Sequence, residues 1–172
     1  MEEIAGAVGC APATLYGYFK SKSELWMCLL TTRLGQYLAG VELAVEPSRG
    51  YRAGLDHLVS HFCSYAERER NFLLLLLEML LAPSRGGAPD PEQIVAVSIQ
   101  YRGMVSGLMA RGIEEGILAP RSPQLLATIL LGSFDSILYL WLQSPEGTEF
   151  SEMAAAAVDI FERGAMPRES NQ

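Results

Sequence analysis

Apolar residues recur at helical spacing along almost the whole chain, and no stretch alternates apolar and polar positions as a β-strand does. Breaks that contain proline and glycine interrupt this pattern, most clearly in the segment PSRGGAPDP at 83–91. The pattern predicts helices over 2–8, 11–19, 21–46, 52–67, 72–81, 92–115, 124–142 and 151–163. We therefore expect an all-α protein.

Two of these helices are apolar enough to be compared with membrane spans. The run FLLLLLEMLLA at 72–82 is too short to cross a bilayer and is apolar on all sides, so we expect other helices to enclose it. The run LLATILLGSFDSILYLWL at 125–142 is nearly long enough, but Asp135 near its middle would be costly in lipid, and no basic cluster flanks it. We expect a buried or dimer-forming helix there and no membrane span.

Composition narrows the class of protein. The 172 residues are 49% hydrophobic and 19% charged, which is typical of a folded chain with one core, or of a small module on a larger domain. The formal net charge of −7 means that a local patch must make any contact with a polyanion. The cysteines form no CxxC pair, which favours free thiols and a reducing, cytoplasmic setting.

The first two predicted helices, joined at Gly9, are the elements of a helix-turn-helix. Apolar residues on one face of each helix are expected to form the joint between them: Ile4, Val8, Leu15 and Phe19. The outward arc of the second helix carries small residues flanked by tyrosines, namely Ala13, Thr14 and Gly17 with Tyr16 and Tyr18. Small residues let a helix enter the major groove, tyrosine hydroxyls reach phosphates, and a threonine reaches a base edge.

The only two lysines of the chain, Lys20 and Lys22, follow this helix directly. Ser21 and Glu24 have the S-x-x-E spacing of a capping box, so we expect a helix to begin here with Lys22 in its first turn. A helix N-terminus offers unpaired N–H groups to an anion, and Lys22 would complete a phosphate site with Lys20 as a weaker second cation. The alternative is an ordinary capped helix with solvated lysines.

The run IAGAVGCAPATLYGYFKSKSELW resembles the DNA-binding segment of the TetR-family (tetracycline-repressor-like) transcriptional regulators. Their consensus is roughly I-A-x-x-A-G-V-S-x-x-T-L-Y-x-Y-F-x-S-K-x-x-L. The residues that match it are Ile4, Ala5, Gly9, Thr14, Leu15, Tyr16, Tyr18, Phe19, Ser21, Lys22 and Leu25. By this resemblance, Ala13 and Thr14 would face bases, Tyr16 and Tyr18 would contact bases or backbone, and Lys22 would bind phosphate.

The resemblance also implies how such a protein works. Family members are homodimers joined by their last two long helices, here 124–142 and 151–163. A small effector binds among the middle helices and moves the two DNA-reading helices apart, which releases the operator. The implied division is a DNA-binding segment at 1–23, an effector-binding and dimerisation domain at 24–164 and a tail at 165–172.

In the family, a whole N-terminal helix and the start of the next one precede the position of Ile4, and this sequence does not contain them. Their absence would uncover apolar surface on Ile4, Val8, Leu15 and Phe19. We therefore expect the 172-residue form to bind DNA poorly while its larger domain still folds. The alternative function is that of a truncated helical protein that binds a ligand and dimerises.

Candidate effector-binding residues lie on the inward stripes of the middle helices: Phe62, Tyr65, Met79, Tyr101 and Met104. Small-molecule pockets are mostly apolar with few polar groups, and methionines adapt to varied ligands. Gly103 and Gly107 are expected to leave space inside the longest helix. We predict a bulky, largely hydrophobic effector that Tyr65 or Tyr101 hydrogen-bonds; the alternative is that these residues are simply core.

Metal and enzyme chemistry have weaker support. His57 and His61 lie one helical turn apart near Asp56 and Cys63, a spacing that can chelate zinc or copper. The sequence fixes no third ligand, so we favour polar residues at a helix surface or pocket rim and expect no metal and no cofactor. The chain has no glycine-rich phosphate loop, no HExxH and no nucleophile elbow, so we do not expect an enzyme.

Overall fold

Helices form all the regular structure in the described residues 1–81, 91–143 and 149–167 of this computed structural model. They are α1 (Glu2–Val8), α2 (Pro12–Tyr18), α3 (Lys22–Ala44), a short 3-10 helix η1 (Pro47–Arg49), α4 (Gly50–Arg68), α5 (Arg70–Leu81), α6 (Pro91–Glu114), α7 (Pro123–Gln143) and α8 (Phe150–Ala165). The predicted all-α class is confirmed. Most of the predicted loop at 83–91, and the last residues of the predicted tail, lie outside the described residues.

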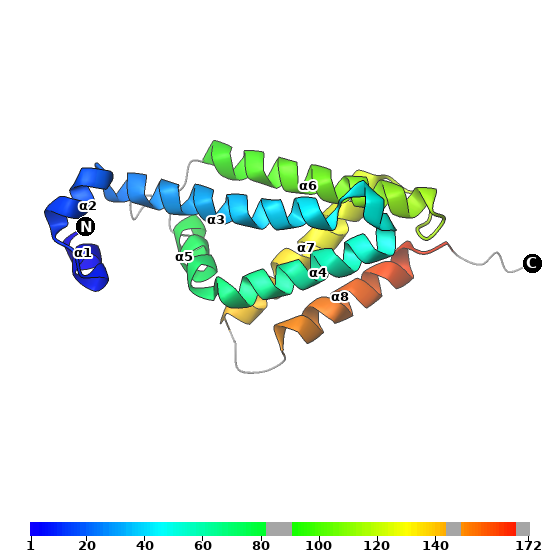
Figure 1. Cartoon of the computed structure of the whole chain (residues 1–172). Helices are drawn as coiled ribbons and strands as arrows, with labels where there is room; N and C mark the ends of the chain where they lie inside the picture. Colours follow the sequence, from blue (N-terminus) through cyan, green and yellow to red (C-terminus); the bar gives the residue numbers. More distant parts are fainter. Residues whose placement is uncertain (82–90, 144–148, 168–172) are drawn as a thin grey trace, which may run out of the picture.

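The helices are arranged as a body with a small appendage (Figure 1). α1 and α2 lie at one end of the molecule, beyond the body, and α3 runs from them into it. Within the body α3 packs on α4 and α6, α7 packs on α6 and α8, and α4 contacts both α6 and α8. Because α3 belongs to both parts, it is the physical connection between the appendage and the interior of the body.

Local signals account for the turns around α1 and α3. Gly9 ends α1 in the left-handed conformation, at a φ of 72°, and its N–H bonds back to the carbonyls of Ala5 and Gly6. The predicted capping box at the start of α3 is confirmed. The Ser21 Oγ accepts the Glu24 N–H at 3.1 Å, and the Glu24 carboxylate accepts the Lys20 N–H at 2.6 Å.

The start of α4 is capped from a distant part of the chain. Gly50 begins this helix with a φ of 71°, and no neighbouring side chain caps it. The Glu115 carboxylate, just beyond the end of α6, instead accepts the N–H of Tyr51 at 3.0 Å. This contact closes α4 against α6 and satisfies an N–H that the helix cannot satisfy internally.

The main core lies where α4, α6, α7 and α8 meet. The apolar face of α4 is turned toward it: Leu55, Leu58, Phe62 and Ala66 are buried. Phe62 stacks on Phe134 of α7, with ring centroids 4.6 Å apart. A second, smaller cluster of buried residues consists of Trp26, Leu30 and Phe72, and it joins the first half of α3 to α5.

The two most apolar helices are only partly enclosed by the rest of the protein. On α5, Phe72 is buried, but Leu75 remains 41% exposed, so the expected enclosure on all sides is wrong for this residue. Among the described helices, α7 alone has the length and composition of a membrane span, and 33% of its most apolar window is buried. Its exposed apolar side chains include Leu125, Ile129 and Leu140.

Glycines mark the places where helices approach most closely. A Cβ at Gly54 of α4 would lie 2.6 Å from Leu108 of α6 and 3.0 Å from the Ala44 carbonyl of α3. Gly103 and Gly107 behave differently from their prediction. Both are exposed on α6, and a Cβ at either position would meet no atom within 4 Å, so they leave no space inside the body.

We expect Gly54→Ala to lower the free energy of unfolding by about 1–3 kcal/mol, because the added methyl overpacks a buried contact between helices. Gly107→Ala is the matched control in an exposed helix interior. It should raise the free energy of unfolding by about 0.5–1 kcal/mol, through helix propensity alone. Urea unfolding of both variants at one protein concentration measures this. Equal effects of the two substitutions would contradict the close approach at Gly54.

Candidate functional site

The predicted DNA-reading residues are all on the surface. Pro12 occupies the first turn of α2, and none of that helix is buried. The six candidate contacts, all of them exposed, are Ala13, Thr14, Tyr16, Tyr18, Lys20 and Lys22. Tyr16 and Tyr18 have exposed fractions of 52% and 78%, which is unusual for large aromatic side chains that serve only the fold.

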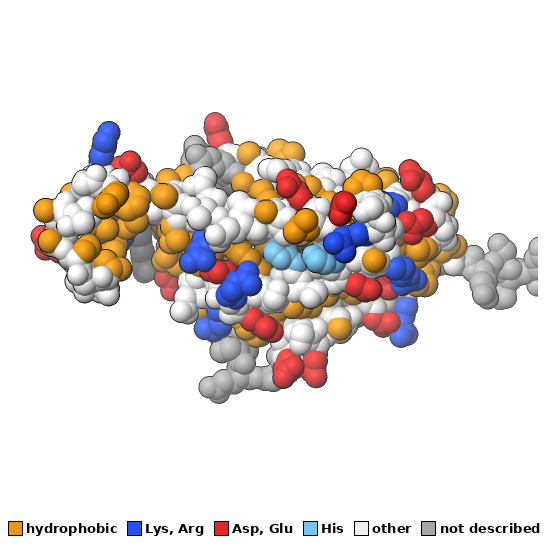
Figure 2. All heavy atoms as spheres, in the orientation of Figure 1, with side chains coloured by type: hydrophobic (Ala, Val, Ile, Leu, Met, Phe, Trp, Pro, Cys, Tyr) orange, Lys and Arg blue, Asp and Glu red, His pale blue; other side chains and the backbone are white. Residues whose placement is uncertain are grey.

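The joint between α1 and α2 is smaller than its prediction. Ala5 is fully buried, while Ile4, Leu15 and Phe19 are half-buried. Val8 is 65% exposed, so it does not take the place expected of it in the joint. Figure 2 shows apolar side chains exposed over α1, α2 and the start of α3, next to a basic side chain that projects at the α2–α3 junction.

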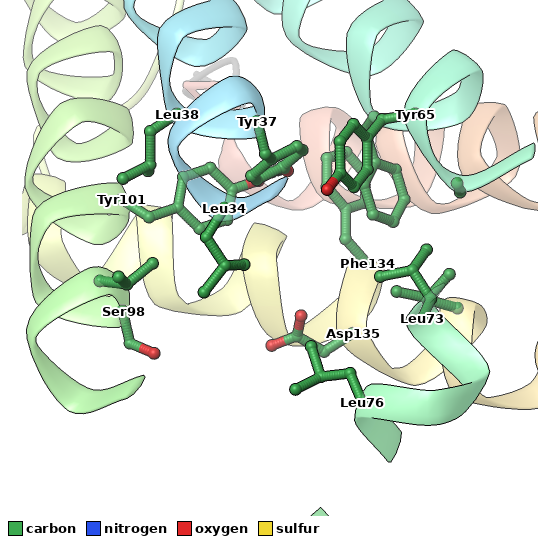
Figure 3. A pocket seen from close by; sticks show the side chains of 14 residues that line it. Leu34, Tyr37, Leu38, Tyr65, Leu73, Leu76, Ser98, Tyr101, Phe134 and Asp135 are labelled. Atoms are coloured by element: carbon green, nitrogen blue, oxygen red, sulfur yellow. Dashed lines mark hydrogen bonds between the residues drawn. The ribbon is translucent and has the colours of Figure 1, made fainter. Parts of the chain in front are cut away.

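A cavity of about 360 Å³ lies in the body, between α3, α4, α5, α6 and α7 (Figure 3). Its lining is mostly apolar and consists of Leu34, Tyr37, Leu38, Phe62, Tyr65, Ala66, Leu73, Leu76, Val97, Ser98, Tyr101, Phe134, Asp135 and Leu138. This volume lies toward the small end of the range of ligand pockets, roughly 300–1,000 Å³. The cavity is suited to a small, largely apolar molecule.

The structure brings three of the five predicted effector-binding residues together in this lining: Phe62, Tyr65 and Tyr101. The other two pack elsewhere. Met79 contacts the small cluster of α3 and α5, and Met104 packs against the main core. Their helical faces point inward as predicted, but inward positions on α5 and α6 are shared between the cavity and the core.

Sequence reasoning missed the contribution of α3 to the cavity. Leu34, Tyr37 and Leu38 line it, and their spacing places them on one face of the helix. That spacing was a usable signal. Asp135 of α7, noted in the sequence only as an obstacle to a membrane span, also lines the cavity.

Three tyrosines form a hydrogen-bonded wall of the cavity. The Tyr37 hydroxyl donates to the Tyr101 hydroxyl at 2.7 Å, and the Tyr65 hydroxyl donates to the Arg33 carbonyl at 3.0 Å. The ring centroid of Tyr37 lies 4.9 Å from that of Tyr65 and 5.3 Å from that of Tyr101. Burial raises the pKa of all three hydroxyls, that of Tyr65 to about 12, so they are neutral at physiological pH.

The carboxyl group of Asp135 is the charged group among the described residues of the lining. Desolvation by the surrounding protein raises its pKa above the usual range, and the positive charge of Arg102 partly offsets this. The residue keeps an accessible surface, which places it at the open side of the cavity. Figure 3 shows its carboxylate turned toward the space between Leu34 and Leu76.

The histidines do not assemble a metal site in the described part of the chain, where no group of three or more histidine, cysteine, aspartate or glutamate residues could hold an ion. The Nε2 of His61 lies 2.9 Å from the Tyr37 carbonyl, and its ring stacks on Tyr37. Burial lowers the pKa of His61, which favours the neutral ring. Through these contacts with Tyr37, His61 holds α4 against α3, and it is not part of the described cavity lining.

An apolar groove of about 340 Å³ runs between α7 and α8 on the outside of the body. Its lining includes Leu125, Ile129, Ala157 and Ile160, together with the buried Phe161. Ile160 is 72% exposed on this face. These two helices are the ones that the resemblance assigns to dimerisation.

The known proteins to which this chain is similar in sequence include regulator proteins. No family model matches the chain. The chain is 20% identical over 165 residues to the fatty acid metabolism regulator protein of Bacillus subtilis, covering 95% of this chain and 84% of that protein. It is 25% identical over 147 residues to the HTH-type transcriptional activator FasR of Mycolicibacterium smegmatis, covering 84% of this chain and 63% of FasR.

Solved structures show the same fold. The TetR-family regulator PfmR of Thermus thermophilus superposes with a TM-score of 0.77 at 22% identity, over 97% of this chain and 88% of PfmR. The regulator FadR of Bacillus subtilis, solved in complex with stearoyl-CoA, superposes with a TM-score of 0.75 at 20% identity, over 95% of this chain and 87% of FadR. At this level of identity the superpositions establish a shared fold.

Proposed function

The chain has the fold of the TetR-family transcriptional regulators and resembles their DNA-reading segment in sequence, and we propose that it is a DNA-binding regulator that responds to a small molecule. The observation that carries the proposal is the continuity of α3. Its first turn holds Lys22 and the capping box, and its middle lines the cavity with Leu34 and Tyr37. One helix therefore belongs to both sites.

This continuity supplies a physical route from effector to DNA. A molecule that fills the cavity pushes on α3 from the side of α5, α6 and α7, and a rigid helix carries that displacement to α1 and α2 (Figure 1). In a dimer the two DNA-reading helices must match the spacing of successive major grooves. A change in the angle of α3 alters that spacing, so effector binding releases the operator, as in a repressor.

The effector we propose has a hydrocarbon chain. The cavity wall is built from leucines, phenylalanines and neutral tyrosines, which favour apolar surface. Among similar proteins, one is a fatty acid metabolism regulator and another was solved with stearoyl-CoA. The relatives are transcriptional regulators, which agrees with a regulatory and not an enzymatic role.

The active form we propose is a homodimer built from α7 and α8. The groove between them exposes the apolar side chains of Leu125, Ile129 and Ile160, which are in contact with water in a single copy of the protein. A second copy placed on this face would bury them, which also explains the membrane-like apolarity of α7 without a membrane. We place such a regulator in the cytoplasm, where its DNA is.

The DNA-binding part of the proposal is tested by selecting, from a random pool of duplex DNA, the sequences that the full-length protein binds. We expect enrichment of an inverted repeat, and Lys22→Ala should lower affinity for all duplexes and reduce the slope of log affinity against log salt by about 1. Thr14→Ala should instead relax the preference at one base position, because threonine is placed to read a base edge.

Arg49→Ala is the matched control, since it removes an exposed cation from η1, far along the chain from α2. It should leave the salt dependence unchanged. Failure to enrich any sequence, or an equal loss of affinity in Arg49→Ala and Lys22→Ala, would overturn the assignment of α2 and the start of α3 to DNA.

A further inference from the structure

The charge in the described lining of the cavity is of one sign, negative. Among the described residues that line it, Asp135 provides the one carboxylate, and none is a lysine, an arginine or a histidine. The positive charge of Arg102 lowers the pKa of Asp135, but the two side chains form no ion pair in the described part of the chain. Among the described lining residues, a ligand that enters this cavity therefore meets a carboxylate and no cation that would neutralise an acid of its own.

The tyrosine hydroxyls of the cavity do not donate hydrogen bonds to the Asp135 carboxylate. The hydroxyls of Tyr37 and Tyr101 bond to each other, and the Tyr65 hydroxyl donates to a backbone carbonyl. Within the described ranges, no side chain or backbone N–H donates a hydrogen bond to the Asp135 carboxylate. Its oxygens, turned toward the space between Leu34 and Leu76, are left to accept from a molecule in the cavity (Figure 3).

Asp135 is an exposed residue of α7, so its carboxylate lies at the open side of the cavity and not within the apolar wall. The surrounding protein still disfavours its charged form, and this is the first cause of its raised pKa. The charge of Asp135 therefore does not stabilise the fold, and its carboxylate is available to a molecule in the cavity.

We propose that Asp135 receives the head group of the effector and selects heads that donate a hydrogen bond and carry no negative charge. Alkyl amines, alcohols and amides belong to this class, and free fatty acids do not, because two carboxylates would repel each other beside a mostly apolar lining. The apolar lining holds the chain of the same molecule. The inference rests on the proposed function, since it assumes that this cavity holds the effector.

The test uses three probes that share one chain and differ in the head: dodecylamine, dodecanol and dodecanoate. Binding to the full protein is measured by calorimetry below the concentrations at which the probes form micelles. For the wild-type protein we expect the amine and the alcohol to bind at least about tenfold more tightly than the carboxylate. For Asp135→Asn this preference should shrink to within about threefold, mainly through weaker amine binding and stronger carboxylate binding.

Asp56→Asn is the matched control, because it removes the same charge from an exposed position on α4 outside the cavity lining. It should leave the order of the three probes unchanged. The thermal unfolding midpoint of the unliganded Asp135→Asn protein at neutral pH should be equal to or higher than that of the wild type. A lower midpoint would indicate a structural role for Asp135.

The outcomes distinguish a failure of the role proposed for Asp135 from a failure of the proposed effector class. Dodecanoate binding as tightly as dodecylamine, or an unchanged preference in Asp135→Asn, overturns the role of Asp135 and leaves a hydrocarbon effector standing. Failure of all three probes to bind overturns both this inference and the proposed effector class.

Discussion

Replacing Ile160 by glutamate converts the protein from a dimer to a monomer and lowers its affinity for DNA below that of the wild type. Ile160 is 72% exposed and lines the groove between α7 and α8, where the second copy is proposed to pack. An unpaired charge buried in such an interface costs about 3–5 kcal/mol, which is about two to four orders of magnitude in the dissociation constant. A symmetric interface carries the substitution twice.

Sedimentation analysis over a range of protein concentrations measures this change, and a gel shift measures its effect on DNA. Ala155→Glu is the matched control, because Ala155 is also exposed on α8 but is not part of the groove lining. It should remain dimeric. A dimeric Ile160→Glu protein, or a wild type that is monomeric at all concentrations, would show that α7 and α8 do not form the interface.

Replacing Phe134 by alanine lowers the free energy of unfolding by about 3–5 kcal/mol, because the substitution leaves a space within a buried aromatic stack of the core. Phe134 is 1% exposed and stacks on Phe62 with an interplanar angle of 9°. Phe62 in turn lies against Phe150 of α8, with ring centroids 5.2 Å apart. The loss is therefore transmitted to the contacts among α4, α7 and α8.

Urea unfolding followed by circular dichroism measures this loss, at one fixed protein concentration because dimerisation contributes to apparent stability. Phe134→Leu should lose less, since leucine fills part of the space. Ser136→Ala, on the exposed side of the same helix, should stay within about 0.5 kcal/mol of the wild type. Equal stability of Phe134→Ala and Ser136→Ala would show that the aromatic stack does not hold the core.

The sequence was most informative where structure depends on neighbours along the chain. The capping box at Ser21 and Glu24 and the end of α1 at Gly9 were both predicted correctly. Each depends on residues within about one or two helical turns of one another. The same is true of the segment predicted to read DNA, because its resemblance to a family lies in one continuous run.

Prediction was weaker for residues on the inward face of a helix. Met79 and Met104 point inward, as predicted, yet they contact core clusters and not the cavity. Gly103 and Gly107 were expected to leave space inside, but both are exposed on the outside of α6. Periodicity tells which side of a helix is apolar, but it does not distinguish a core contact, a cavity wall and an interface with a second copy.

The sequence by itself determined the helical class, the helix boundaries to within a few residues and the segment that resembles a DNA reader, because local hydrogen bonds and side-chain periodicity decide these features. Only the tertiary structure decided the cavity. Tyr37 meets Tyr101 across 64 positions of the chain, and the carboxylate of Glu115 caps a helix through an N–H that lies 64 positions earlier. Which side chains share one space depends on the angles at which helices pack, and those angles follow from the fit of all the helices together.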